Sequence, residues 1–239
     1  MSDGSVAPRI FLVTGASRGI GAAVCAHLHR AGHVVIGACR RPDAATGLHE
    51  LGVAAVALDN DDPESIASLP ERVAAHVDHL DVLVNNAGIK QVPGYSWESS
   101  AGPMPHVDQD AILQVLRTNL VGPILVTQAL VPLIASPGGI VVNVSSQLGS
   151  LAVGVDIDYA YNASKAGLNM TTVTMQRDLG AQGIAAVALN PGWMKTDLAG
   201  DEAPLEVDAA TRDIADLLER VDSSFGGTFV DRFGDPVPW

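Results

Sequence analysis

Short, continuous apolar runs recur along the chain, separated by longer segments in which apolar residues have helical spacing. A continuous run indicates a strand buried on both faces, as the strands of parallel sheets are. We therefore predict about seven strands, at residues 9–14, 33–38, 54–58, 80–85, 139–145, 184–189 and 227–231.

The intervals between these runs predict helices. The clearest are residues 159–181 and the amphipathic segment 207–221, whose apolar residues lie along one side. A helix at 22–31 is expected to end at Gly32, because glycine readily forms a left-handed cap. Strands that alternate with helices imply right-handed crossovers and a mainly parallel sheet. We predict an α/β, doubly wound Rossmann-type fold that forms one domain over residues 1–239.

Composition fits a soluble enzyme. A chain of 239 residues can bury one sizeable core, and 47% hydrophobic against 17% charged residues suits a sheet covered on both faces. The net charge of −13 argues against nucleic acid and anionic membranes as partners. Cys25 and Cys39 are too few for a disulfide framework, so we expect reduced thiols and a cytoplasmic protein.

The segment most similar to a membrane span is 120–144. Pro123, Pro132 and Pro137 interrupt it, so a helix, a turn and a buried strand explain it better. The first residues contain neither the basic stretch nor the apolar stretch of a secretion signal. We expect no membrane association.

A glycine-rich turn joins the first predicted strand to the first predicted helix. Gly15, Gly19 and Gly21 follow Thr14 with the spacing G-x-x-x-G-x-G, which differs from the G-x-G-x-x-G of other dinucleotide folds. Such glycines let the backbone approach a pyrophosphate at the helix N-terminus, where free N–H groups and the helix dipole favour anions. The alternative is a tight turn that needs glycine only for its conformation.

Tyr161 and Lys165 stand one helical turn apart, so both side chains lie on one face of the helix predicted there. A phenol titrates near ~10 and is a poor acid at neutral pH. A neighbouring cation favours the phenolate and makes the hydroxyl a better proton donor. Tyr159 lacks this arrangement, because Ala163 stands four residues later.

Together these features resemble the short-chain dehydrogenase/reductase family, over nearly the whole chain. The motifs occur in the family's order and all follow predicted strands or lie on predicted helices. They are the turn at 14–21, Asn85-Asn86-Ala87-Gly88, Asn119, Ser145-Ser146, Tyr161 with Lys165, and Asn190-Pro191-Gly192 with Thr196. In such folds ligands bind beyond the carboxyl ends of the strands, so one site is expected there.

The resemblance implies a catalytic set of four residues. Tyr161 protonates the developing alkoxide, and Ser146 hydrogen-bonds the substrate oxygen. Lys165 holds the cofactor ribose and assists Tyr161, while Asn119 anchors a water that links Lys165 to solvent. Ser145 adjoins Ser146 and leaves the choice of serine open, although the resembling motif favours the second.

The resemblance also implies a nicotinamide cofactor. Its contacts are assigned to Gly15, Ser17, Arg18, Gly19, Ile20, Gly21, Arg40, Arg41, Asp59, Asn60, Asn86, Ala87, Gly88, Tyr161, Lys165, Pro191, Gly192 and Thr196. Proteins that select NAD usually place an acid after the second strand, whereas NADP needs cations for its 2′-phosphate. Here Cys39 is followed by two arginines, and Arg18 lies within the glycine turn. A guanidinium fork suits phosphate, so we expect NADPH/NADP⁺.

A narrower resemblance is to the carbonyl-reductase branch that includes Sniffer and the bacterial C-factor proteins. It rests on residues 145–150, on Tyr159-Ala160-Tyr161 and on the final Gly-Asp-Pro-Val-Pro-Trp. This branch implies reduction of a ketone or aldehyde to the alcohol.

The substrate pocket is expected to be built from loops 89–106, 147–158 and 193–206. These loops contain several large apolar residues and few cations, which suits an uncharged, largely apolar small molecule. The candidates are Val92, Tyr95, Trp97, Leu148, Leu151, Val153, Val155, Trp193 and Met194, any of which could instead pack its own loop. His106 is more typical of surface structure than of an acid–base catalyst, and no metal site is expected.

Two other functions stay open. One is an NAD-linked alcohol dehydrogenase, which the arginines after the second strand disfavour. The other is a signalling protein of C-factor type that binds a dinucleotide without turnover; retention of the catalytic set disfavours it.

The helices around 111–134 and 159–181 resemble those that pair in this family, and the latter has small or adaptable residues at helical spacing. We expect a homodimer or homotetramer, with packing on the protomer's own sheet as the alternative.

Overall fold

The chain forms a seven-stranded sheet in the computed structural model, which describes residues 7–90, 108–153 and 159–239. The strand order is β3-β2-β1-β4-β5-β6-β7, and every neighbouring pair is parallel. The strands are β1 (Ile10–Thr14), β2 (Val34–Cys39), β3 (Ala54–Ala57), β4 (Val82–Asn85), β5 (Ile140–Val144), β6 (Ala185–Asn190) and β7 (Phe229–Asp231). The predicted doubly wound fold is confirmed.

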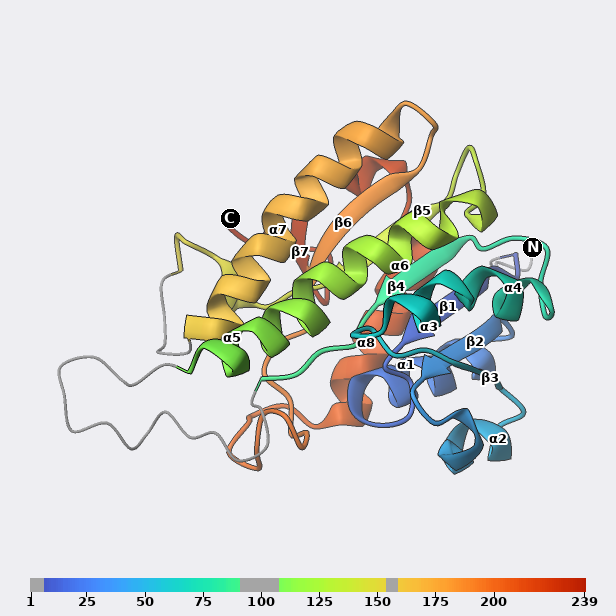
Figure 1. Ribbon diagram of the computed structural model, residues 1–239, viewed down its shortest axis with the longest axis horizontal. Helices are drawn as coiled ribbons and strands as arrows, with labels where there is room; N and C mark the ends of the chain where they lie inside the picture. Colours follow the sequence, from blue (N-terminus) through green and yellow to red (C-terminus); the bar gives the residue numbers. More distant parts are fainter. Residues whose placement is uncertain (1–6, 91–107, 154–158) are drawn as a thin grey trace, which may run out of the picture.

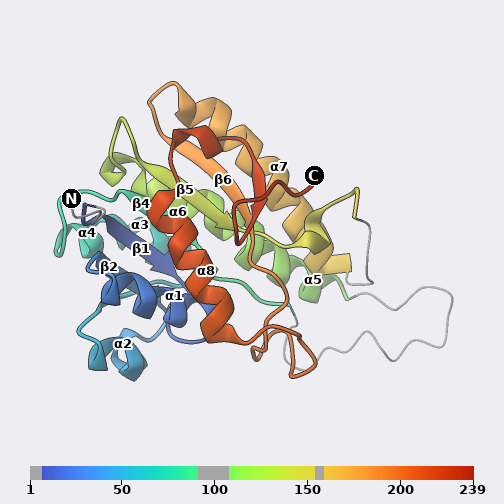
Figure 2. The same cartoon turned by 180° about the vertical axis from the view of Figure 1, so that it is seen from behind.

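Helices cover both faces of the sheet (Figures 1 and 2). One face carries α1 (Gly19–Arg30), α2 (Thr46–Glu50) and α8 (Val207–Arg220). The other carries α3 (Pro63–Ala67), α4 (Leu69–Ala74), α5 (Gln109–Leu116), α6 (Gly122–Leu130) and α7 (Tyr159–Gly180). Because the strands alternate their side chains between the two faces, two apolar clusters form.

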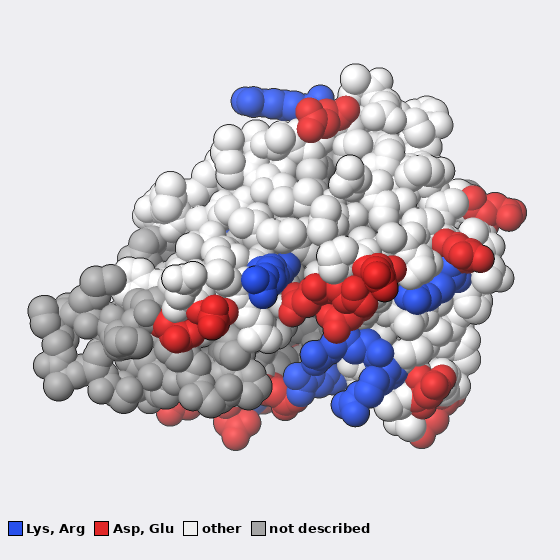
Figure 3. All heavy atoms as spheres, in the orientation of Figure 1, with Lys and Arg blue, Asp and Glu red and all other residues white. Residues whose placement is uncertain are grey.

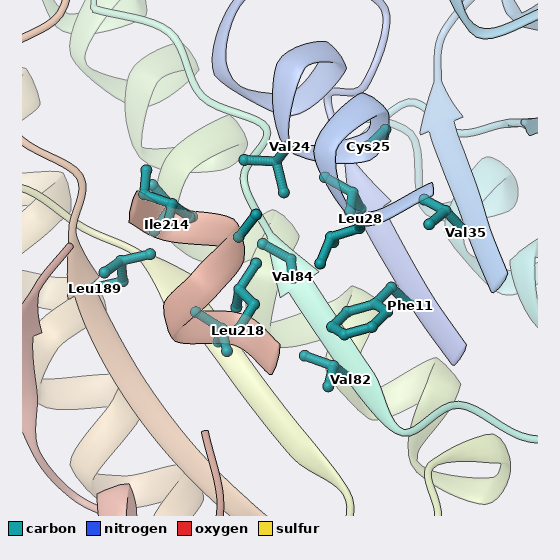
Figure 4. Close-up of a cluster of buried hydrophobic side chains, with 14 of the residues drawn as sticks. Phe11, Val24, Cys25, Leu28, Val35, Val82, Val84, Leu189, Ile214 and Leu218 are labelled. Carbon is teal, nitrogen blue, oxygen red and sulfur yellow. The ribbon is translucent and has the colours of Figure 1, made fainter. Parts of the chain in front are cut away.

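The cluster under α1 and α8 shows how one buried strand contributes side chains to the apolar clusters on both faces of the sheet. Phe11 of β1 faces Leu28 of α1 and the apolar side of α8, including Leu218 (Figure 4). The next residue, Leu12, belongs to the opposite cluster. Apolar surface removed from water on both faces stabilises the fold by roughly 25 cal/mol per Å². The continuous apolar runs in the sequence have this physical cause.

Both cysteines lie in the same core. Cys25 on α1 and Cys39 at the end of β2 are buried and form no disulfide. Burial raises the pKa of Cys25 to about 12, so this thiol stays protonated. The prediction of free thiols is confirmed.

Strand ends differ from the predicted ranges by one or two residues. Leu80 was expected to begin the fourth strand but forms an isolated bridge with Ile134, and β4 begins at Val82. Gly227 was expected to begin the seventh strand, but it has a left-handed φ of +74° and lies in the preceding turn. Apolar character fixes which runs are strands, whereas local turns fix where they begin.

The helix expected around 111–134 is divided into four elements. A π-helical turn, η3 (Arg117–Val121), lies between α5 and α6, and a 3-10 turn, η4 (Val131–Leu133), follows α6. The combined segment Gln109–Leu133 is long and apolar enough to cross a membrane by length and composition alone. In the structure Val126 and Leu130 face the sheet, so packing against the sheet accounts for part of the apolar content.

Candidate functional site

The motif residues meet at the carboxyl edge of the sheet. Thr14 ends β1, Asn85 ends β4, Ser145 follows β5, and Pro191 follows β6. Since all strands are parallel, these ends share one edge. The structure therefore brings the glycine turn, the Asn-Asn-Ala-Gly segment, the serine pair and the Pro-Gly segment together.

Glycines permit close contact within this edge. A Cβ on Gly15 would lie 2.8 Å from Cα of Ala87, and Gly15 has a φ of +66°. A Cβ on Gly21 would lie 2.5 Å from the carbonyl oxygen of Gly15. Any larger side chain at these two positions would push the turn away from β4.

Thr14 fixes the segment after β4 onto the glycine turn. Its Oγ1 accepts hydrogen bonds from the backbone N–H groups of Asn86 and Ala87, both at 3.0 Å. The Asn86 amide donates to the Thr14 carbonyl oxygen at 2.8 Å. The two segments predicted to contact a dinucleotide thus form one hydrogen-bonded unit.

The start of α1 suits a bound anion. Arg18 stands at the N-cap with an extended backbone, no side chain among the described residues caps the helix, and its first turn contains no acid. Gly19 has a left-handed φ of +56°. The exposed N-terminal turn, which also includes Ser17 and Ile20, fits the pyrophosphate of a dinucleotide.

Cations lie near this turn. Arg40 and Arg41 follow β2 and are exposed, as is Arg18. In Figure 3 basic side chains gather between α2 and α3, directly beside an acidic group. Exposed guanidinium groups at this edge fit the 2′-phosphate of NADP.

The segment after β6 contacts the same turn. Arg18 forms an ion pair with Asp197 at 2.7 Å, and both side chains are exposed. Thr196 lies against Gly19, with its Cγ2 3.8 Å from the position of a Cβ there. An isolated bridge pairs Met194 with Leu205 and closes this loop at its base. Lys195 pairs with Glu206 at the same place.

The predicted dyad lies on α7. Lys165 is 4% exposed and donates from Nζ to the Val144 carbonyl oxygen at 2.7 Å. Its Nζ lies 5.5 Å from the centre of the Tyr161 ring. Burial lowers the pKa of Lys165 to about 8. The ammonium is therefore still charged at neutral pH but close to its titration point.

The two serines after β5 have different surroundings. Ser145 is 1% exposed and donates from Oγ to the Asn169 side chain at 2.6 Å. Ser146 is half-buried, and its Oγ accepts the Leu148 N–H at 3.2 Å. Ser145 is committed to the contact between β5 and α7, so Ser146 is the serine that could reach a substrate.

Asn119 lies within the π-helical turn and is fully buried. Its side chain accepts from the Ile89 N–H at 2.8 Å and donates to the Ile89 carbonyl oxygen at 2.7 Å. It also donates to Ser164 Oγ at 3.1 Å. A Cβ on Gly88 would lie 3.3 Å from Asn119 Oδ1 and 3.7 Å from Lys165 Nζ. Asn119 and Lys165 therefore both border the backbone of Gly88.

Asp59 and Asn60 lie after β3. The Asp59 carboxylate accepts the Asp61 N–H at 3.1 Å. Asn60 is 8% exposed, and its side chain packs on Gly122 at the start of α6, where a Cβ would lie 2.8 Å away. A cofactor contact from Asn60 would thus come from its backbone.

Asn190 joins the two loops that follow β5 and β6. Its Oδ1 accepts N–H groups from Gln147 and Gly192, both at 3.2 Å. Gly192 has a left-handed φ of +87°, which lets the chain turn after Pro191. The loop with Ser146 and the loop with Thr196 are thereby held at a fixed separation.

Some residues that support the site were not assigned a site role from the sequence. Thr14, Ser164, Asn169 and Asn190 act through contacts between elements that are distant in the chain. Thr14 and Asn190 belong to the recognised motifs, Ser164 lies between Tyr161 and Lys165, and Asn169 follows one helical turn after Lys165. Tyr159, expected not to be catalytic, is 46% exposed.

The residues expected to line the pocket have different surroundings. Val92, Tyr95, Trp97, His106 and Val155 lie outside the described residues. Leu151, Val153 and Trp193 are exposed, and Leu148 is half-buried. Met194 requires a correction: it is 1% exposed and packs in the core, because its pairing with Leu205 turns the side chain inward. Within the described ranges, no cluster of three or more His, Cys, Asp or Glu residues could hold a metal ion.

The fold, the glycine turn and the Tyr–Lys pair together define a nicotinamide-dependent oxidoreductase class. The chain belongs to the short-chain dehydrogenase family, whose model matches residues 9–206. The resemblance inferred from the motifs is thus confirmed.

Individual relatives lie in the expected branch. Sniffer, the carbonyl reductase of D. melanogaster, is 30% identical with a TM-score of 0.85, over 97% of this chain and 100% of that structure. An NADPH-bound carbonyl reductase from chicken fatty liver is 28% identical with a TM-score of 0.85, over 97% and 99%. C-signal of Myxococcus xanthus is 35% identical over 163 residues, which are 67% of this chain and 93% of that protein.

Proposed function

We propose that this oxidoreductase reduces a ketone or aldehyde to the alcohol with NADPH. The observation that carries the proposal is the buried Lys165 beside the Tyr161 ring. Lys165 is hydrogen-bonded to Val144, the last residue of β5, and Ser146 follows two residues later. Among the described residues, Lys165 pairs with no carboxylate, and its hydrogen-bond acceptor is one carbonyl oxygen, that of Val144. It does have a chemical use, which is to make the phenol a better acid.

Each residue of the catalytic set has a defined task in this proposal, and Lys165 has two. When bound, NADPH supplies the hydride. Tyr161 donates a proton to the oxygen that becomes an alkoxide, and Ser146 donates a hydrogen bond to the same oxygen. Lys165 stabilises the phenolate left on Tyr161 and holds the cofactor ribose. Asn119 orders the Ile89 backbone beside Lys165, where a water could pass a proton to solvent.

The preference for NADPH over NADH rests on charge. Arg40 and Arg41 occupy the place where an acid would hold the ribose hydroxyls of NAD, and Arg18 adds a third cation. Two of the similar proteins support the proposed class: one is the carbonyl reductase Sniffer, and the other is the NADPH-bound carbonyl reductase from chicken fatty liver.

The substrate is proposed to be small to medium in size and largely apolar. Loops 89–106, 147–158 and 193–206 would enclose it. Leu151 and Trp193 expose apolar surface in these loops, at 87% and 51% exposure. Apolar walls with few polar groups favour uncharged ligands.

A panel of uncharged ketones and aldehydes with NADPH and NADH tests the proposal. We expect reduction of several members with NADPH and weaker turnover with NADH. Reaction only in the direction of alcohol oxidation with NAD⁺ would favour the alcohol dehydrogenase alternative. Binding of NADPH with no turnover of any member would favour the signalling alternative. The similarity to C-signal is the reason to consider this alternative.

We also propose a cytoplasmic homodimer or a homotetramer of dimers. The surface over α6 and α7 supports this, because Figure 3 shows mostly uncharged atoms there. Val121, which ends η3 just before α6, and Met170 on α7 are exposed at 41% and 61%.

A further inference from the structure

The residues after β7 turn back and run antiparallel beside it. Asp231 donates its N–H to the Asp235 carbonyl oxygen at 2.8 Å, and Val237 donates to the Phe229 carbonyl oxygen at 2.8 Å. This return segment, residues 235–239, covers the outer edge of the sheet. The free edge of a sheet offers such hydrogen bonds to any extended strand.

The return segment ends on the loop that follows β5. Ser150, which is 5% exposed, donates from Oγ to the Pro238 carbonyl oxygen at 2.7 Å. Ala152 donates its N–H to the Trp239 carbonyl oxygen at 3.1 Å. Ser150 Oγ also accepts the Val153 N–H at 3.1 Å. Within the described residues, the hydrogen bond from Ala152 is the one that ties 151–153 to another part of the fold.

The Trp239 ring stacks on a buried aromatic ring and is partly exposed. It stacks on Phe229 with 5.5 Å between ring centres and 26° between planes. Phe229 is 2% exposed, so it gives the indole a fixed support. Trp239 is 41% exposed, and the neighbours of Ala152 in the loop, Leu151 and Val153, are also exposed. In Figures 1 and 2 this end of the chain lies beside α7, the helix of the catalytic dyad.

We propose that Trp239 is a specificity-determining residue. The return segment positions the loop after Ser146, and the partly exposed indole binds an apolar ring or chain that extends from the substrate carbonyl. Indole, Leu151 and Val153 carry no charge, so a charged extension would lose solvation without gaining a partner. The inference rests on the proposed function, in which Ser146 binds the carbonyl oxygen.

Kinetics with a small ketone, cyclohexanone, and a larger apolar one, α-tetralone, test the proposal. Trp239→Ala is expected to raise KM for α-tetralone by about 3- to 10-fold, since an aromatic pair and its contact area are lost. KM for cyclohexanone and kcat for both ketones stay within about twofold, because the dyad is untouched. Trp239→Phe keeps most of the stacking and restores KM.

Phe233→Ala is the matched control. Phe233 is an aromatic residue of the turn between β7 and the return segment, with 47% exposure, but its ring lies under Arg232, 4.1 Å from the guanidinium carbon. This variant should leave both KM values unchanged. An equal rise of KM for the two ketones in Trp239→Ala would overturn the proposal.

Hydrogen exchange tests the link between the return segment and the loop 150–153, and it needs no turnover. In Trp239→Ala and in Ser150→Ala, the amides of Ala152 and Val153 should lose protection, while amides of β5 keep theirs. This result supports the link even if the wild type reduces neither ketone, an outcome that would count against the proposed function alone. Unchanged protection of Ala152 in both variants would overturn the link and with it the role of Trp239.

Discussion

Lys165 sets the electrostatics of the candidate site at the scale of single residues. A lysine that is 4% exposed has lost most of its hydration, and its pKa falls to about 8 for this reason. Its described hydrogen bond to the Val144 carbonyl oxygen only partly replaces water. A charge held near its titration point responds strongly to pH.

The pH dependence follows from this shift. Below pH 8 Lys165 is charged and attracts the cofactor ribose, and as pH rises through about 8 it becomes neutral. We expect kcat/KM for NADPH, which reports on the cofactor-free enzyme, to fall above pH 8. In Lys165→Met the overall value should be low and this break absent. A wild-type profile that stays level through pH 8 would contradict the role of the lysine.

Arg40 is the residue on which the cofactor preference is most directly tested. Arg40→Ala should weaken NADPH by about 10- to 150-fold, the cost of a charge-assisted phosphate contact, and leave NADH nearly unchanged. Titration of both cofactors measures this. Arg30→Ala is the control, because Arg30 is exposed at the far end of α1. Tighter binding of NADH than of NADPH by the wild type would contradict the proposed preference for NADPH.

At the scale of elements, the contact between α7 and the turn η5 (Gln147–Gly149) positions Ser146. A Cβ on Gly149 would lie 2.7 Å from the Lys165 carbonyl carbon and 2.8 Å from its oxygen. The Asn169 amide donates to the Gly149 carbonyl oxygen at 3.1 Å. Backbone contact at this distance is possible only for glycine.

Gly149→Ala should therefore separate η5 from α7. We expect a loss of about 1–3 kcal/mol in the free energy of unfolding, typical of overpacking, together with a lower kcat. Urea unfolding and steady-state kinetics measure the two effects. Gly47→Ala is the control, because a Cβ there meets nothing within 4 Å. Full stability and full kcat in Gly149→Ala would mean that this contact does not position Ser146.

The sequence predicts elements better than it predicts the contacts between them. The seven strands were predicted because parallel strands must be apolar on both faces. The π-helical turn at Asn119 was not, because a helix that changes its hydrogen-bond pattern keeps its apolar spacing. The surroundings of Ser145 and Ser146 differ through Asn169, which is distant in the chain. Met194 was misplaced because apolar loop residues can face inward or outward.

At the scale of the whole molecule, charge is unevenly distributed. The chain carries a net charge of −13, yet α6 contains no charged residue, and on α7 the exposed charges are Arg177 and Asp178 near its end. Figure 3 shows the resulting uncharged surface over both helices. An uncharged face of this kind suits contact with a second copy better than contact with water.

Light scattering tests the proposed oligomer. We expect a particle of at least twice the 24.7 kDa of one chain. Met170→Glu places a charge on the face and should shift the protein toward the monomer. Val34→Glu is the control, because Val34 is an exposed apolar residue of β2, away from α6 and α7. A wild-type particle of 24.7 kDa at micromolar concentration would contradict the proposed oligomer.

The central claim is that the Tyr161 hydroxyl donates the proton in an NADPH-dependent carbonyl reduction. The most direct measurement compares wild type and Tyr161→Phe for NADPH oxidation with a ketone and for NADPH binding without one. We predict that the variant binds NADPH as the wild type does and reduces the ketone roughly 100- to 10,000-fold more slowly. Tyr161→Phe that keeps more than a small fraction of the wild-type rate, or a wild type that reduces no carbonyl, would contradict the account.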